Sequence, residues 1–133
     1  MPAEPAIKRT VAFIDGQNLF YAAKNAFGYG FPNYDVAALA AAVCQRQNWS
    51  LTHTGAYDVA LVFSQDQDLS EVADEIRQVA RQQPRWIKVA SAFPFSPASP
   101  NRRGVNGTDW VKIDRATYDA CLDSRDYRPK PKT

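Results

Sequence analysis

Residues 59–68 read VALVFSQDQD, and this stretch decides how the rest of the sequence is interpreted. The apolar run 59–63 has the length and composition of a buried strand, and acidic residues follow it at once. Residues 11–15, VAFID, show the same pattern, because a short apolar run ends there at Asp15. Both stretches therefore predict a strand inside the protein that ends in an acidic turn.

Strand and helix patterns alternate around these two segments. Further strands are predicted at 49–54, 86–93 and 110–113, with a loop rich in proline and serine at 94–107. Helices are predicted after Asn18 as N-cap, after Asp35 as N-cap (35–47), at 70–83 and at 115–122. The alternation predicts one three-layer α/β domain over 11–122, with a mainly parallel central sheet and helices on both faces. Residues 1–10 are expected to form an arm, and 123–133 a basic tail.

One connection does not suit a parallel sheet. Only residues 55–58 separate the predicted strand 49–54 from the strand 59–63, whereas a parallel crossover needs a dozen or more residues. The two strands could form a hairpin, or the first segment could be no strand at all. The preferred interpretation is that residues are missing between Thr54 and Gly55, either deleted from the protein or left out of the printed sequence.

Composition narrows the class of protein. The length of 133 residues fits a single domain, and the net charge of +2 is too small to indicate nucleic-acid binding by itself. Basic residues nevertheless gather at 77–88, at 102–103 and in the tail at 125–132. No apolar run approaches the ~20 residues of a membrane span, and the N-terminus lacks the layout of a signal peptide. A cytoplasmic protein without membrane contact is expected.

The cysteines and the histidine restrict the metal chemistry that the chain could perform. Cys44 and Cys121 both lie in helical patterns, which predicts buried reduced thiols and neither a disulfide nor a zinc site. His53 is the single histidine, which argues against a histidine-based metal site or catalytic triad. Carboxylates are therefore the residues to consider.

Asp15, Asp66 and Asp68 follow the two apolar strands, and sites in open α/β sheets lie outside the carboxyl ends of strands. Carboxylates brought together repel each other unless a cation neutralises them, and oxygen ligands suit Mg²⁺ or Mn²⁺. Each acid taken alone also has a local explanation, as a turn residue or a helix cap. Asp109 is a fourth candidate ligand, entering the last strand. Arg102 and Arg103, in the 94–107 loop, could contact phosphates.

These motifs, in this order, resemble those of the NYN domain family, a branch of the PIN-like nucleases. Residues 13–19, FIDGQNL, are similar to the family's first-strand motif Asp-Gly-x-Asn, and residues 62–69, VFSQDQDL, to its Ser-Gly-Asp-x-Asp-Phe motif. Residues 108–111, TDWV, resemble its late Ala-Asp-x-Phe segment. Gln65 stands where the family has glycine and Leu69 where it has phenylalanine. The family's Lys-Gly-x-Asp helix, which supplies another acid before the second of these motifs, has no counterpart here.

The resemblance implies a PIN-like three-layer fold, Mg²⁺ or Mn²⁺ binding and ribonuclease activity. By position, Asp15, Asp66 and Asp68 would be the metal-site acids, Asn18 would position the metal, its water or a phosphate, and Asp109 would be an outer member. The leading hypothesis is a metal-dependent endoribonuclease whose partner is single-stranded or structured RNA, with a homodimer left open. The alternative is a non-catalytic RNA- or protein-binding module on the same scaffold. A phosphatase or receiver-like acid pocket is a weaker third.

Overall fold

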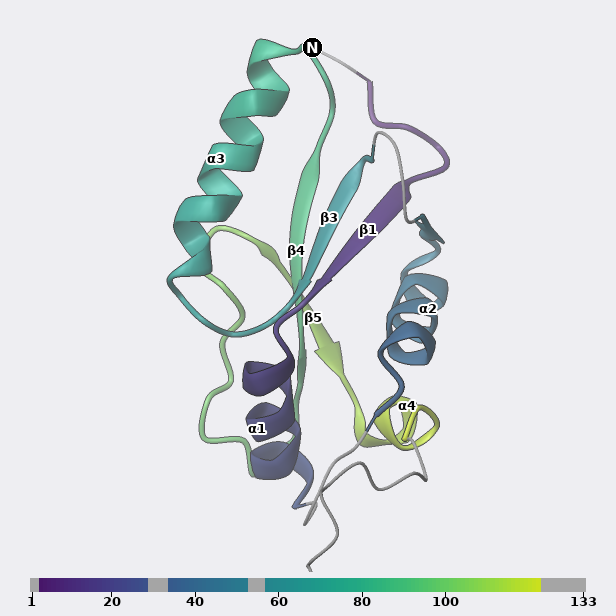
Figure 1. The fold of residues 1–133 in the computed structure, drawn as a ribbon, viewed down its shortest axis with the longest axis vertical. Coiled ribbons are helices and arrows are strands. Elements are labelled where there is room, and N and C mark those ends of the chain that lie inside the picture. Colours follow the sequence, from purple (N-terminus) through teal and green to yellow (C-terminus); the bar gives the residue numbers. More distant parts are fainter. Residues whose placement is uncertain (1–2, 29–33, 53–56, 123–133) are drawn as a thin grey trace, which may run out of the picture.

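The computed structural model describes residues 3–28, 34–52 and 57–122, and in this part of the chain five strands form one parallel sheet (Figure 1). The strand order is β2-β1-β3-β4-β5, an order common among doubly wound α/β proteins. The strands are β1 (Arg9–Ile14), β2 (Ser50–Leu51), β3 (Val59–Phe63), β4 (Lys88–Pro94) and β5 (Asp109–Ile113). The helices are α1 (Gly16–Phe27), α2 (Val36–Gln47), α3 (Leu69–Gln82) and α4 (Arg115–Asp119).

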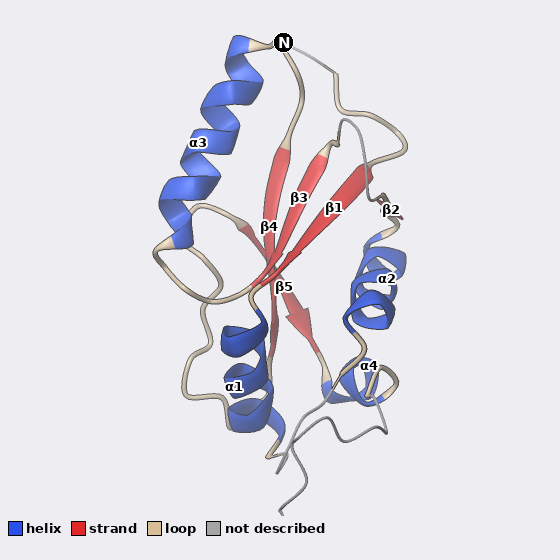
Figure 2. Ribbon diagram, viewed as in Figure 1, coloured by secondary structure: helices blue, strands red, loops and turns tan. Residues whose placement is uncertain are grey.

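Both faces of the sheet are covered, which confirms the predicted three layers. Leu61 and Phe63 of β3 belong to the larger core, which they share with α1, α2 and α4. Ala60, the residue before Leu61, points to the opposite face and packs with Ala73 of α3. Figure 2 shows α3 on the side of the sheet away from α2 and α4. A strand that is buried on both faces needs apolar residues at every position, which explains the unbroken run 59–63.

The first strand and the first helix both begin earlier than the sequence predicts. β1 starts at Arg9, so the predicted arm 1–10 is too long by two residues. Asn18 is not the cap of α1, because Asp15 takes that place and its carboxylate accepts a hydrogen bond from the backbone N–H of Asn18. Asp35 caps α2 as predicted, by accepting from the backbone N–H of Ala38.

The short connection leads from β2 on one side of β1 to β3 on the other, without running back along the length of the sheet. β2 and β3 lie on opposite sides of β1 and both run parallel to it, so the hairpin interpretation is wrong. Within the described part of the predicted strand 49–54, residues 49–52, the strand is Ser50–Leu51, and both Leu51 and Val59 stand opposite Thr10. The chain therefore has to cover about two strand spacings, roughly 10 Å, a distance that residues 52–58 can span. The printed chain runs directly from Thr54 to Gly55, and this junction lies outside the described residues.

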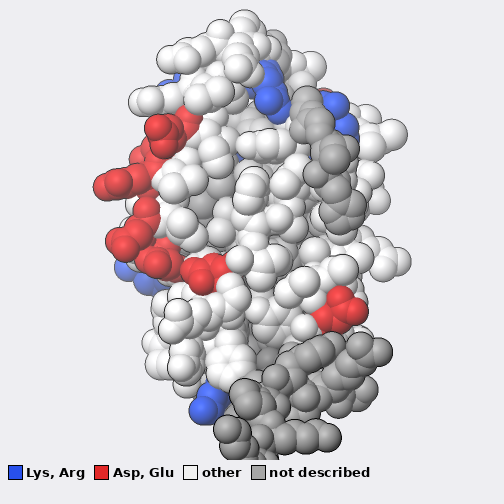
Figure 3. Space-filling view, in the orientation of Figure 1, with Lys and Arg blue, Asp and Glu red and all other residues white. Residues whose placement is uncertain are grey.

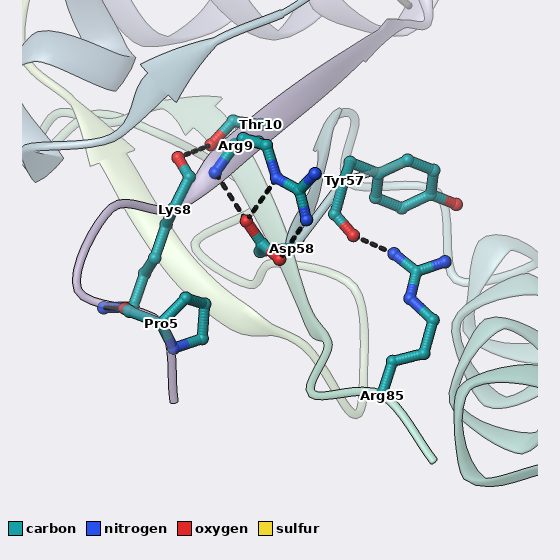
Figure 4. Close-up of polar contacts among 7 residues, drawn as sticks. All are labelled: Pro5, Lys8, Arg9, Thr10, Tyr57, Asp58 and Arg85. Carbon is teal, nitrogen blue, oxygen red and sulfur yellow. Dashed lines mark hydrogen bonds and ion pairs between the residues drawn. The ribbon is translucent and has the colours of Figure 1, made fainter. Parts of the chain in front are cut away.

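Asp58 fixes the point where this connection enters the sheet (Figure 4). Its carboxylate accepts hydrogen bonds from the backbone N–H of Arg9, at 2.8 Å, and from two guanidinium nitrogens of the same residue, at 3.0 and 3.1 Å. The guanidinium group of Arg85 donates to the backbone carbonyl of Tyr57 from the other side. The start of β3 is thus held to the start of β1 and to the segment before β4.

The two cysteines are buried and free, as predicted. Burial raises the pKa of the Cys44 thiol to about 11, so this thiol stays protonated and unreactive at neutral pH. In the described part of the chain, the helices are too short or too polar to cross a membrane.

Candidate functional site

The strand order creates a switch point between β1 and β3. From β1 the chain goes to β2 on one side, and from β3 it goes to β4 on the other. Connections that leave in opposite directions open a crevice at the carboxyl ends of the two strands, which is where such folds bind ligands. Asp15 follows β1 directly and Ser64 follows β3 directly, so both lie at the carboxyl ends of the two strands that flank the switch point.

A chain of hydrogen bonds joins the acids at this edge. One oxygen of the Asp15 carboxylate accepts from the hydroxyl of Ser64, at 3.0 Å. The same hydroxyl oxygen accepts from the backbone N–H of Asp66, at 3.1 Å. The Asp66 carboxylate accepts in turn from the backbone N–H of Asp68, at 3.0 Å. Ser64 is 1% exposed, so it forms a buried link between the carboxylate after β1 and the acidic turn after β3.

Asn18 ties the first turn of α1 to the same turn after β3. Its side-chain oxygen accepts from the backbone N–H of Gln65, at 2.9 Å, and its own backbone N–H donates to Asp15. The role of Asn18 in the fold is therefore to position the acidic turn. Asp68 precedes α3, but its side chain makes no capping hydrogen bond to the helix. Helix capping therefore does not explain this exposed carboxylate.

Two glutamines, for which the sequence predicted no role in the site, dock the loop between β4 and β5 onto the acidic turn. Gln65 is 6% exposed, and its amide nitrogen donates to the backbone carbonyls of Asn101, at 2.9 Å, and Arg103, at 3.0 Å. Gln67 donates to the carbonyl of Gly104 and accepts from the backbone N–H of Asn106, both at 2.8 Å. The alternation of Gln65, Asp66, Gln67 and Asp68 could have indicated this, with glutamines holding structure and acids facing solvent.

Replacing Gln65 by alanine should release this loop. The expected loss is about 1–2 kcal/mol in the free energy of unfolding, because the backbone carbonyls of Asn101 and Arg103 lose the donor that buried Gln65 supplies. Limited proteolysis should also cut faster within 97–106. A variant as stable and as protease-resistant as the wild type would show that other contacts hold the loop.

Arg102 and Arg103 lie beside the acidic turn but are engaged within their own loop. Arg102 donates to the carbonyls of Pro97, at 2.5 Å, and Ser99, at 3.4 Å. Arg103 donates to the side chain of Asn106, at 2.8 Å. Both arginines are exposed, so these contacts are open to exchange for a phosphate.

Asp109 stands apart from the other acids, which corrects its prediction as a metal ligand. It begins β5 opposite Ala90, whereas Asp15 and Asp66 follow the ends of their strands. Through the register of the sheet Asp109 stands level with Ala12, three residues before Asp15, and β3 and β4 lie between its strand and β1. The Asp109 carboxylate forms an ion pair at 3.0 Å with the ammonium group of Lys88, the first residue of β4.

The carboxylate oxygens at the carboxyl ends of β1 and β3 are the kind of ligand that hard cations such as Mg²⁺ prefer. Across residues 3–28, 34–52 and 57–122, no three acids, histidines or cysteines come together as a metal-binding group. Mg²⁺ is commonly held by only one or two carboxylates together with water and substrate phosphates, so Asp15 and Asp66 can satisfy this demand. The bound cation would need its other ligands from water or substrate.

The surface around the acidic turn is negative. Figure 3 shows a band of Asp and Glu side chains along the α3 side of the molecule. The turn and the first half of α3 carry five exposed acids, namely Asp66, Asp68, Glu71, Asp74 and Glu75. A phosphate approaching this band is repelled unless a cation neutralises part of the charge.

Comparison of the chain with known protein families, with curated proteins and with solved structures found no match. The resemblance to the NYN family therefore rests on the short motifs around Asp15 and Asp66.

Proposed function

We propose that this protein is a Mg²⁺- or Mn²⁺-dependent ribonuclease whose site lies at the carboxyl ends of β1 and β3. The observation that carries the proposal is the hydrogen-bonded link from Asp15 through Ser64 to Asp66 at the switch point of the sheet. Local capping alone does not require a buried serine to connect the acids that follow two different strands. The motif resemblance adds the expectation that RNA is the substrate.

Each residue at the edge has a defined task in this proposal. Asp15 and Asp66 would hold the cation. The carboxylate of Asp68 would accept hydrogen bonds from water molecules bound to the cation. Ser64 orients the Asp15 carboxylate by donating to one of its oxygens, which leaves the remaining lone pairs for a cation. When bound, the cation would supply an activated water and offset charge on the phosphodiester. Arg102 and Arg103, next to the turn, would contact the RNA backbone.

The test is cleavage of single-stranded RNA by the wild type and by Asp15→Asn, with Mg²⁺ or Mn²⁺ present. Cleavage by Asp15→Asn should be slower by about 100-fold, since the amide that replaces the carboxylate binds a divalent cation far more weakly. Asp74→Asn is the control, because it removes one exposed acid from α3 without touching the turn. Equal rates for the wild type and Asp15→Asn, or cleavage that persists in a chelator, would remove the assignment.

A non-catalytic binding module on the same scaffold is the second candidate. Its specific support is that the described acids form no group of three. This candidate predicts RNA or partner-protein binding that weakens with salt, survives Asp15→Asn and is accompanied by no cleavage.

A further inference from the structure

A small polar cavity opens directly beside the acidic edge. Its volume is about 150 Å³, and it lies between α1 and the segment 99–101 of the loop before β5. Its polar walls come mainly from Asn18, Tyr21, Asn25, Gln65 and Asn101. Asn18 and Gln65 also belong to the hydrogen-bond network of the acidic turn, so a ligand in the cavity would adjoin the proposed cleavage site.

The loop that forms one wall of this cavity is held at two points. The hydroxyl of Ser96 donates to the backbone carbonyl of Ala26, which ties the loop to α1. The amide of Gln65 donates to the carbonyl of Asn101 at 2.9 Å, which ties the loop to the turn after β3. Between these ties, Ser99 is 6% exposed and closes a short turn with Ser96. The cavity is thus a consequence of how the loop is held.

The lining indicates the chemistry of the ligand. It contains no charged residue, so it offers no cation for a phosphate. The amide nitrogens of Asn18 and Asn101 and the side chain of Asn25 make no hydrogen bond to the described residues. Amide groups present donors and acceptors side by side, the combination that matches the edge of a nucleobase.

Tyr21 adds an aromatic surface at the mouth of the cavity. It is 53% exposed, and the neighbouring ring of Phe20 meets it edge-on, at 5.4 Å between centroids. An exposed ring beside amide nitrogens that have no partner among the described residues suits a planar ligand that stacks on the ring while its edge forms hydrogen bonds. A solvated surface tyrosine would not need a row of amides along one side.

We infer that this cavity binds one unpaired base of a single-stranded RNA, with Tyr21 stacking on the base and Asn25 and Asn101 contacting its edge. The inference rests on the proposed function for its substrate class. The protein then binds a base next to the phosphodiester at Asp15, so that the affinity for RNA depends on the base as well as on the RNA backbone.

The test measures binding with Ca²⁺ in place of Mg²⁺ or Mn²⁺, so that a cation still offsets the negative charge of the acidic turn while cleavage is slowed. Fluorescence anisotropy would follow a labelled short RNA strand and a set of the same strands in which one base at a time is removed. For the wild type, loss of the base at one position should weaken binding at least about fivefold. Tyr21→Ala should weaken binding of the intact strand about as much and abolish the difference between intact and abasic strands. Tyr21→Phe, which keeps the stacking surface, should bind almost as the wild type does.

Two further variants sharpen the result. Asn25→Ala should weaken binding about threefold or more, whereas Gln78→Ala, which removes an exposed amide from α3, should leave it unchanged. Equal affinity of the wild type for every abasic strand, unaltered binding by Tyr21→Ala, or no binding to RNA at all would overturn the inference. Base-dependent binding without any cleavage would support the cavity and remove the nuclease proposal. Cleavage that requires Asp15, combined with base-independent binding, would support the nuclease proposal and overturn the inference about the cavity.

Discussion

Gly104→Ala is expected to lower the free energy of unfolding by about 3 kcal/mol, because its added methyl group has no room. A Cβ atom on Gly104 would lie 2.4 Å from Cδ1 of Trp110 and 2.5 Å from Oγ of Ser91. Neither neighbour can move freely. The Ser91 hydroxyl is buried and bonded to Thr108 and to the backbone N–H of Val105, and the indole N–H of Trp110 donates to the Val105 carbonyl.

The loop has to shift instead, and that shift reaches the candidate site. The carbonyl of Gly104 accepts from Gln67, and the carbonyl of Arg103 accepts from Gln65. Denaturant unfolding should show the loss of stability, and a thermal melt should fall by roughly 10 °C. RNA cleavage by the folded variant should fall as well, because the acidic turn loses its support.

Gly16→Ala is the matched control for Gly104→Ala. Gly16 opens α1, and the nearest atom to a Cβ there is the Tyr34 hydroxyl at 3.9 Å. Alanine in this position should be neutral or stabilise the protein by up to about 1 kcal/mol. Equal stability of Gly104→Ala and Gly16→Ala would contradict the packing of the loop on Ser91 and Trp110.

Asp58→Ala is expected to lower the free energy of unfolding by about 2–3 kcal/mol at neutral pH. Three hydrogen bonds from Arg9 lose their acceptor, and one of these donors is a backbone N–H at the start of β1. The Asp58 side chain is 9% exposed and that of Arg9 is 52% exposed, so the freed guanidinium can reach water but the backbone donor is less able to. Asp74→Ala, at an exposed acid 3.4 Å from Arg77, should change stability by under about 0.5 kcal/mol.

The effect of Asp58→Ala should depend on pH in a defined direction. The hydrogen bonds from Arg9 hold the pKa of Asp58 below its ordinary value. The stability contributed by its charge is therefore complete above about pH 4 and is lost as the pH falls through the lowered pKa. Urea titrations of the wild type and the variant at a series of pH values should converge in strong acid. A difference in stability that stays constant down to that range would show that Asp58 acts without its charge.

Much of the fold follows from local sequence patterns. The apolar run 59–63, the periodic helices and the Asp35 cap are local features, so the sequence predicts them within a few residues. The start of β1 at Arg9 depends on partners distant in the chain, whereas the Asp15 cap of α1 is a local contact with the backbone N–H of Asn18. Arg9 is drawn into β1 by Asp58 and Ser50, and no local pattern around Arg9 shows either contact. That β2 and β3 form no hairpin could not be predicted, because the two-residue β2 and its place at the level of Thr10 are visible only in the register of the sheet.

The sequence by itself determined that acids follow two apolar strands, because each apolar run and its acidic turn are consecutive in the chain. The prediction that both strands are buried is correct for β3 and wrong for β1, where Phe13 is 45% exposed. That Ser64 joins these acids, that Gln65 and Gln67 dock the later loop, and that Asp109 lies away from the edge were decided only by the tertiary structure. The physical reason is the same in each case. Hydrogen bonds between side chains and distant backbone groups depend on which strand ends become neighbours, and this is set by strand order and not by any single segment.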